Sequence, residues 1–241
     1  MLLACGDSFT FGSECLEPTN RWSTQLSNRL GMEEVNLALP GGSNSRCVRV
    51  IVEHCLTNSN PDLIVMLWTF PGRQEYMLNY EISGSRWHEP AAVGKWPFTV
   101  PLNAHDEERR DNELFQEFVT SLYKHSHSED YDAYLMYKEM QHLQNFCKVK
   151  NINYVPIFTY NQLWLTHRGI PYYMKYPWFS YMSADLNSFL NFNDQGYIDW
   201  CRDMKFAFGQ YGHPTDDANI AAAQYLYENI DKYLTSKEPI K

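Results

Sequence analysis

The chain lacks three features that would assign a protein to a class at once: a cluster of basic residues, a long apolar run and a paired-cysteine motif. Its 241 residues carry 20 Lys and Arg against 29 Asp and Glu, a net charge of −9 with His neutral. A phosphate backbone needs a basic surface, so we expect no nucleic-acid partner. The longest uninterrupted apolar run, Leu63 to Trp68, is far shorter than the roughly 20 residues of a transmembrane helix, so we expect no membrane partner.

The six cysteines are scattered along the chain and contain no CxxC pair. Several lie in apolar segments, which favours free thiols in a reducing compartment over disulfides. No basic region followed by a long apolar stretch and a small-residue cleavage site is visible near the N-terminus, so we expect no secretory signal. The sequence therefore predicts a cytoplasmic protein.

A candidate metal site has little support. His125 and His127 form a His-x-His pair close to Glu129 and Asp130, and such residues can ligate a metal ion. The surrounding stretch is polar, however, and is more simply interpreted as a solvated loop. We therefore expect no metal site.

Apolar segments of strand length alternate with segments of helical spacing. Such alternation predicts a parallel sheet with helices on both faces, here in a single domain over 1–241. Two regions, about 72–130 and about 160–208, break the alternation and are predicted to be irregular insertions, the first with some helix near 111–124. The expected strands are 1–6, 33–38, 62–68 and 152–159, and the expected helices are 20–30, 45–57, 131–150 and one that follows Pro214.

Small polar residues mark the starts of two of these helices. Ser43 or Asn44 can cap the helix at 45–57. Thr215 can cap the last helix, and two acidic residues in its first turn complement the helix dipole.

The segment Gly6-Asp7-Ser8 directly follows the first predicted strand. Ligands of open α/β sheets bind beyond the carboxyl ends of the strands, and a serine on a tight turn there can expose its hydroxyl as a nucleophile. The same residues also fit a plain strand-to-helix turn with Ser8 as the N-cap. This segment alone does not separate the two interpretations.

Two further segments can supply the groups that a serine nucleophile needs. His213-Pro214 precedes the last helix, and histidine is the usual base for a serine hydroxyl because it titrates near neutrality. The glycine-containing loop 36–44 can offer backbone N–H groups to a developing oxyanion. Taken singly, the histidine also fits an ordinary helix start, and the loop also fits an ordinary turn.

Together the three segments resemble the SGNH (GDSL-type) hydrolase family. Gly6-Asp7-Ser8 matches its first block, Asn36 and Gly41 match its second, and His213-Pro214 matches its last. The resemblance covers about 1–72, 131–159 and 209–235. It implies a flavodoxin-like three-layer α/β/α sandwich with a central parallel sheet. It also implies ester hydrolysis by acyl transfer, with Ser8 as nucleophile, His213 as base and no metal or organic cofactor.

The sequence departs from the family pattern in the third block, which usually carries an asparagine that donates to the oxyanion. Here the strand at 63–68 continues into Thr69-Phe70-Pro71-Gly72-Arg73, which contains no asparagine. Thr69 or Arg73 can supply the missing donor. The predicted oxyanion donors are therefore Gly41, Asn44, Thr69 and Arg73.

A second departure concerns the acid that the family usually has three residues before the histidine. That position is Gln210, which can orient an imidazole but cannot stabilise an imidazolium by charge. An Asp→Asn change costs about 10⁴ in turnover in a serine protease triad. The protein therefore uses a dyad, takes an acid from elsewhere or is inactive; the candidate orienting residues are Gln210, Asp7 and Asp216, with Asp203 and Asp185 as further sources of the acid.

Two further expectations concern substrate and biological context. Aromatic residues are dense in 160–208 and can line a cleft or simply pack as a cap or interface; Trp68, Tyr173 and Trp178 are the predicted substrate contacts. The Trp-Thr-x-Pro-x-Arg stretch also resembles SGNH-like proteins encoded by tailed bacteriophages. The predicted substrate is a small-molecule or glycan ester, for example an O-acetylated glycan. The alternative is a catalytically impaired module that binds glycan or has a structural role, and homo-oligomers or virion assembly stay open.

Overall fold

The centre of the molecule is a four-stranded parallel sheet with strand order β2-β1-β3-β6. The computed structural model describes residues 1–78, 98–102, 117, 120–122, 124–125, 128–161 and 189–234. The strands of this sheet are β1 (Leu2–Cys5), β2 (Glu34–Asn36), β3 (Leu63–Trp68) and β6 (Asn153–Phe158); the helices are α1 (Ser8–Phe11), η1 (Pro18–Asn20), α2 (Trp22–Leu30), α3 (Asn44–Thr57), α5 (Glu129–Lys150), α7 (Tyr197–Asp203), α8 (Asp216–Asn229) and η6 (Ile230–Tyr233).

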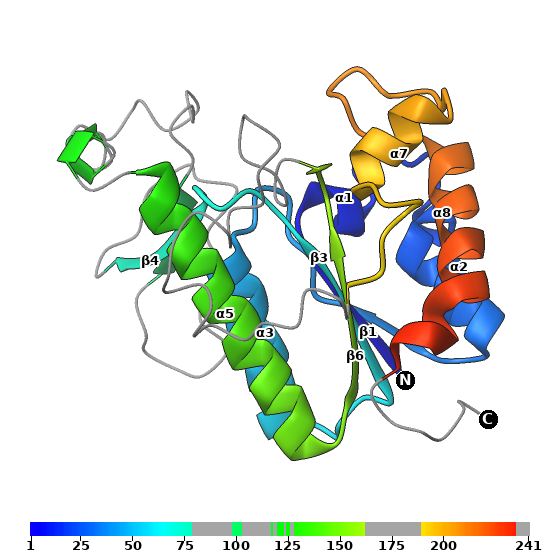
Figure 1. Ribbon diagram of the computed structural model, residues 1–241, viewed down its shortest axis with the longest axis horizontal. Helices are drawn as coiled ribbons and strands as arrows, with labels where there is room; N and C mark the ends of the chain where they lie inside the picture. The colour runs from blue at the N-terminus through cyan, green and yellow to red at the C-terminus, as the bar shows by residue number, and fades with distance from the viewer. Residues whose placement is uncertain are drawn as a thin grey trace.

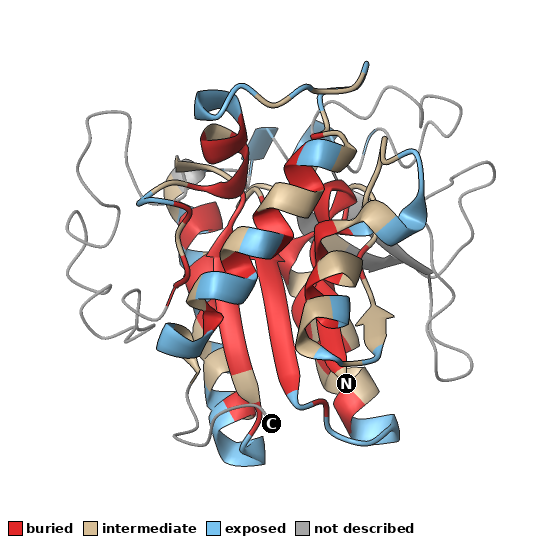
Figure 2. Ribbon diagram, turned by 90° about the vertical axis from the view of Figure 1, so that its right-hand side faces the viewer, coloured by how far each residue is buried: buried red, intermediate tan, exposed pale blue. Residues whose placement is uncertain are grey.

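Helices cover both faces of the sheet, α2 and α8 on one side and α3 and α5 on the other (Figure 1). Alternate residues of each strand point to opposite faces. In β3, Leu63, Val65 and Leu67 pack on the α2–α8 side. Ile64, Met66 and Trp68 pack on the α3–α5 side. All six are fully buried, and Figure 2 shows the central strands of the sheet in the colour of buried residues. Burial on both faces explains why the sequence of β3 is a continuous apolar run. The predicted three-layer α/β/α sandwich is confirmed.

The first predicted insertion is not irregular throughout. It contains an antiparallel pair, β4 (Gln74–Leu78) and β5 (Phe98–Leu102). The prediction was wrong here because β5 carries Pro101, which weakens a strand signal and is tolerated in a two-stranded edge pair. Arg49 of α3 joins this pair to the core, since its guanidinium binds the Glu75 carboxylate at 2.7 and 3.0 Å. Most of the helix expected near 111–124 lies outside the described residues.

The predicted starts of α3 and α8 are confirmed. Of the two side chains predicted to cap these helices, one makes the capping hydrogen bond and the other does not. Ser43 caps α3, because its Oγ accepts from the backbone N of Arg46 at 3.2 Å. Thr215 occupies the N-cap of α8, but its hydroxyl donates to the Ala207 carbonyl at 3.1 Å. All six cysteines are free thiols. Within the described part of the chain, no helix is both long and apolar enough to cross a bilayer.

Candidate active site

The predicted motif segments meet beyond the carboxyl ends of the sheet strands. Figure 1 shows α1 and the segment between α7 and α8 at this end of the molecule. The loop after β2 joins the loop after β1, since Leu39 N donates to the Gly6 carbonyl at 3.3 Å. The N-terminus of α3 joins the end of β3, since the Asn44 carboxamide exchanges two hydrogen bonds with the Thr69 backbone at 2.9 and 3.0 Å.

Ser8 is the first residue of α1, and Asp7 caps the helix. Asp7 Oδ1 accepts from Phe9 N at 3.1 Å. The alternative in which Ser8 is the N-cap is therefore wrong, and the Ser8 side chain is left without a capping role. Neither its hydroxyl nor its backbone N–H is hydrogen-bonded to another of the residues that the structure describes.

Asp7 connects the loop after β1 to the loop after β3. It is fully buried, and its Oδ2 accepts from Thr69 Oγ1 and Arg73 Nη1, each at 2.6 Å. The same Nη1 lies 3.0 Å from Thr69 Oγ1, and the guanidinium lies over the Phe70 ring at 5.0 Å. The Thr69 hydroxyl donates to Asp7 and therefore has no proton for an oxyanion. The other N–H groups of Arg73 make no hydrogen bond to described residues, so Arg73 keeps donors for a ligand.

The two matched residues of the second block have different environments. Asn36 is a structural tie: its Nδ2 donates to the Thr10 carbonyl at 2.9 Å and to Ser23 Oγ at 3.1 Å. Gly41 has φ 76° and no heavy atom within 4 Å of where a Cβ would stand. Its N–H donates to no described residue. Gly41 thus offers an open donor, whereas Asn44 is already engaged with the Thr69 backbone.

The imidazole of His213 is held by Glu14, a residue that the sequence motifs did not indicate. Glu14 Oε2 lies 2.9 Å from Nδ1 of His213 and accepts from His213 N at 3.0 Å. The carboxylate also accepts from Tyr211 N at 2.9 and 3.1 Å. Partial burial alone raises the pKa of Glu14, but the hydrogen bonds from the Tyr211 and His213 amides and from the His213 ring outweigh it and lower that pKa.

None of the predicted orienting residues touches this ring. Gln210 is exposed, and Asp7 is engaged as described. Asp216 binds Leu16 N at 3.0 Å and Asn20 Nδ2 at 2.8 Å, because it lies at the start of α8 beside the loop after α1. Asp203 accepts from Gln195 Nε2, and Asp185 lies outside the described residues.

Ser8 and His213 come to the same part of the molecule. The ring of Phe9, the residue after Ser8, lies 5.1 Å from the His213 ring between centroids. No hydrogen bond joins Ser8 Oγ to the His213 ring in the described structure. Catalytic hydrogen bonds are often long in the absence of substrate and close only in the reacting complex.

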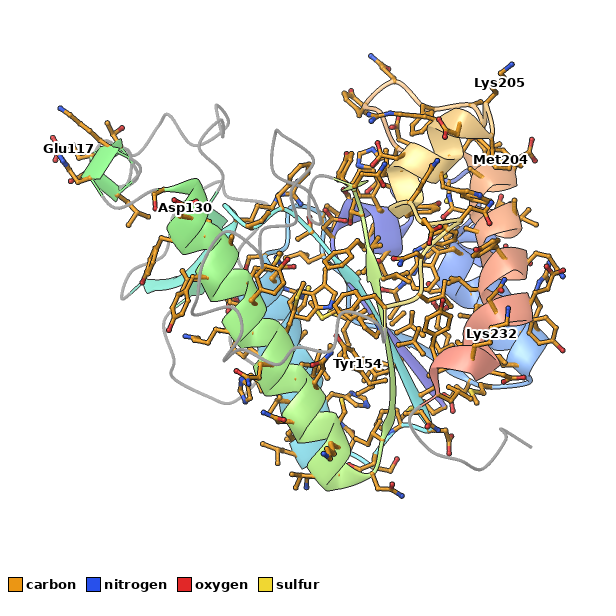
Figure 3. The ribbon with its side chains drawn as sticks, in the orientation of Figure 1. Glu117, Asp130, Tyr154, Met204, Lys205 and Lys232 are labelled. Atoms are coloured by element: carbon orange, nitrogen blue, oxygen red, sulfur yellow. The ribbon has the colours of Figure 1, made fainter. Side chains whose placement is uncertain are left out.

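The structure describes one of the three predicted substrate contacts, Trp68. Trp68 is fully buried and its Nε1 donates to Tyr154 OH at 2.9 Å. Tyr154 belongs to β6 and packs in the same cluster as residues of α3 and α5 (Figure 3). The prediction for Trp68 is therefore wrong, because its side chain faces the α3–α5 layer. Tyr173 and Trp178 lie outside the described residues. Tyr160, which was not among these predicted contacts, lies near the same end of the sheet: its ring is 6.1 Å from that of Phe9 and 4.9 Å from that of Phe70.

The described residues contain no group of three or more side chains that could hold a metal ion. His125 is exposed and His127 is not among the described residues. The groups that do converge at the end of the sheet are a hydroxyl, an imidazole held by a carboxylate, open backbone N–H groups and a guanidinium. Such a set can support acyl transfer.

Comparison with solved structures identifies the fold. TesA superposes with a TM-score of 0.53 at 11% identity, over 97% of this chain and 99% of its own. The psychrotrophic esterase EstA from Pseudoalteromonas sp. gives 0.52 at 12% identity, over 96% and 97%. A member of the lipolytic protein G-D-S-L family from Veillonella parvula gives 0.51 at 11%, over 96% and 98%.

The fold is therefore that of the SGNH (GDSL-type) hydrolases. No family model matches the chain, and no curated protein matches its sequence. The SGNH-type scaffold is thus present in a chain whose identity with these structures is only 11–12%. At that level the likeness defines the architecture, and the chemistry has to be argued from the residues at the end of the sheet.

Proposed function

We propose that the protein is an SGNH-type serine ester hydrolase that transfers an acyl group to water. The observation that supports the proposal is the 5.1 Å contact between the rings of Phe9 and His213, which brings the histidine beside the residue that follows the unengaged Ser8. Almost the whole chain separates Ser8 from His213, and an α/β sheet binds its ligands beyond the carboxyl ends of its strands, where Ser8 lies.

In the proposed reaction, Ser8 Oγ attacks the acyl carbon while His213 Nε2 takes its proton. His213 then returns the proton to the leaving alcohol, and the acyl group stays on Ser8. A water molecule then attacks the acyl carbon while His213 takes its proton; the bond between the acyl carbon and Ser8 Oγ breaks, the acid leaves, and His213 returns the proton to Ser8 Oγ. Every step uses protein side chains and water alone.

The oxyanion is stabilised by the N–H groups of Ser8 and Gly41 and by the guanidinium of Arg73. Neither N–H group is hydrogen-bonded to a described residue, and Arg73 is fixed by Asp7 and Thr69 while keeping further donors. Thr69 is excluded from this role by its bond to Asp7. Removing one such donor typically costs a factor of about 10²–10³ in turnover.

Short acyl esters, including those of O-acetylated glycans, are the proposed substrates. EstA is described as an esterase. A further structure with a TM-score of 0.51 at 12% identity, from Corynascus thermopiles, is a carbohydrate esterase family 2 enzyme with a carbohydrate-binding domain; the match covers 96% of this chain and 65% of that one. The open position at Gly41 and the aromatic residues Phe70 and Tyr160 are compatible with a sugar or a short acyl group.

The test is active-site labelling combined with turnover. A fluorophosphonate probe should label the wild type at Ser8, as read by mass spectrometry of the modified peptide. Ser8→Ala should abolish labelling and lower hydrolysis of p-nitrophenyl acetate and acetylated xylan by at least about 10³-fold. Ser13→Ala, a change in the same loop, is the matched control and should leave both intact. A wild type that neither reacts nor hydrolyses these esters would contradict the proposal, and glycan binding without turnover would favour a binding module.

A further inference from the structure

The Glu14 carboxylate is enclosed by the turn that carries His213. Its three donors are the Tyr211 amide, the His213 amide and the His213 ring. The turn closes on itself as well, since Gly209 N donates to the His213 carbonyl at 2.8 Å and Gly212 N donates to the Gly209 carbonyl at 3.1 Å. The carboxylate and the turn therefore form one hydrogen-bonded unit.

The backbone conformation of Glu14 and the lack of a side chain at Gly209 both permit the contact between the carboxylate and the turn. Glu14 has φ 65°, a left-handed conformation that is uncommon for a residue with a side chain and persists where the surroundings hold it. A Cβ on Gly209 would lie 2.3 Å from Glu14 Oε1 and 2.4 Å from Glu14 Cδ. Only glycine at position 209 leaves room for the carboxylate where it stands.

The chemistry of the pair fixes the proton on the ring. An ionised carboxylate can only accept hydrogen bonds, so Nδ1 of His213 carries the proton that lies between it and Glu14. In the neutral imidazole this leaves Nε2 with a free lone pair. That is the tautomer that a base acting on a serine hydroxyl must have.

Asp216, three residues after His213, is engaged elsewhere, since it binds Leu16 N and Asn20. Among the described residues, Glu14 is the ionisable group that contacts the imidazole.

We propose that Glu14 completes a Ser8–His213–Glu14 triad, in which it holds the imidazole in the reactive tautomer and stabilises the imidazolium formed during acyl transfer. This inference rests on the proposed function. In this triad the acid lies six residues after the nucleophile. In the usual family pattern the acid lies three residues before the histidine, a position that is Gln210 in this chain. Glu14 is a positioning residue, since it acts on substrate only through His213.

The main test is Glu14→Gln, which keeps the shape of the side chain and removes its charge. We expect kcat on p-nitrophenyl acetate to fall by about 10²–10⁴-fold with little change in KM, because the charge matters most when the imidazolium forms. Asp216→Asn is the control for loss of a carboxylate in the same region and should leave kcat and KM unchanged.

Nuclear magnetic resonance provides a readout that does not depend on turnover. In ¹⁵N-histidine-labelled wild type, neutral His213 should show a protonated Nδ1 and an unprotonated Nε2, assigned by loss of the signals in His213→Ala. The bias towards this tautomer should weaken in Glu14→Gln. If Nε2 carries the proton in the wild type, the proposal is overturned.

Gly209→Ala tests the same contact without changing a polar group. Gly209 has no left-handed φ, so alanine changes only the space beside Glu14. We expect kcat of Gly209→Ala to fall at least tenfold. The double variant Gly209→Ala/Glu14→Gln should have a kcat no more than about twofold below that of Glu14→Gln alone, because both changes break the same contact.

The outcomes separate the two proposals. If the wild type is active and Glu14→Gln retains its kcat, the triad is overturned and the Ser8–His213 hydrolase stands. If the wild type has no esterase activity and Ser8 is not labelled, the hydrolase is overturned and the triad with it, whatever the ring tautomer. Circular dichroism of each variant confirms that it is folded.

Discussion

Asp7 and Glu14 belong to the same loop region, and the structure uses them in opposite ways. Asp7 is fully buried and joins the loop to the segment after β3 through Thr69 and Arg73. Glu14 keeps 17% of its side chain exposed and joins the loop to the C-terminal turn through His213. One short stretch of chain thus holds two distant segments. Asp7 holds the segment after β3 through a buried ion pair, and Glu14 holds the turn that carries His213 through partly exposed hydrogen bonds.

The difference indicates that stability and chemistry are divided between the two acids. A buried charge that loses its partner is costly, whereas a partly exposed one is compensated by water. We therefore expect changes at the Asp7 end to act mainly on folding and changes at the Glu14 end mainly on the ring of His213. The following predictions test this division, from the largest expected effect on stability to the smallest.

Asp7→Asn should lower the free energy of unfolding by about 3–5 kcal/mol, since it leaves the Arg73 guanidinium without its carboxylate at a mostly buried site. Urea denaturation followed by circular dichroism measures the change. Asp62→Asn is the matched control: Asp62 pairs with the N-terminal amine but is 69% exposed, and its loss should cost less than about 1 kcal/mol. Equal losses of unfolding free energy in Asp7→Asn and Asp62→Asn would contradict the expected difference between a buried and an exposed ion pair.

Thr69→Val should cost about 1–3 kcal/mol. Valine keeps the shape of the side chain but cannot donate to Asp7 Oδ2, which then loses one of its two 2.6 Å partners in a fully buried site. The same denaturation experiment measures it. No change in stability would show that Arg73 alone satisfies Oδ2 of Asp7.

The contribution of Glu14 to stability should depend on pH. The folded-state pKa of Glu14 is lowered, so its stabilising effect is fully present above the unfolded-state pKa of about 4.3 and is lost as pH falls through the folded-state value. Glu14→Gln should therefore be less stable than wild type at pH 7, by on the order of 1 kcal/mol, and the difference should shrink at about pH 3. Thermal unfolding at the two pH values measures this, and a constant difference would contradict it.

Gln210→Ala should have the smallest effect. The side chain is exposed and makes no hydrogen bond with a described residue, although it stands where SGNH hydrolases usually carry the acid. We expect stability within about 0.5 kcal/mol of wild type and esterase kcat within twofold. A large loss of kcat would move the orienting role from Glu14 to Gln210.

The fold was predictable from the sequence because its signals are local. Strand-length apolar runs alternate with helical spacing, and the structure has β1, β2, β3 and β6 where these runs lie. The placement of Ser8 and His213 at one end of the sheet follows from the same order, since parallel strands bring their carboxyl ends together. The two-stranded β4–β5 pair was missed because β4 begins with the polar residues Gln74 and Glu75 and β5 contains Pro101.

Glu14 could not be predicted in the same way. It lies in an irregular stretch between Ser13 and Cys15, and its partner is 199 residues away, so no spacing or periodicity connects them. The only sequence hint is Gly209, whose missing side chain leaves room for the carboxylate. Trp68 shows the converse: its place at the end of a strand suggested access to ligand, but the α3–α5 layer encloses it completely.

Two of the three hydrogen-bond donors to the Glu14 carboxylate are main-chain amides, which any residue except proline supplies. Apart from the His213 ring, the attachment of this turn to Glu14 thus depends on the path of its backbone. The exposed positions 210 and 211 can therefore be varied, with proline left out at 211, without removing a hydrogen bond to the Glu14 carboxylate; Tyr211 itself is 78% exposed.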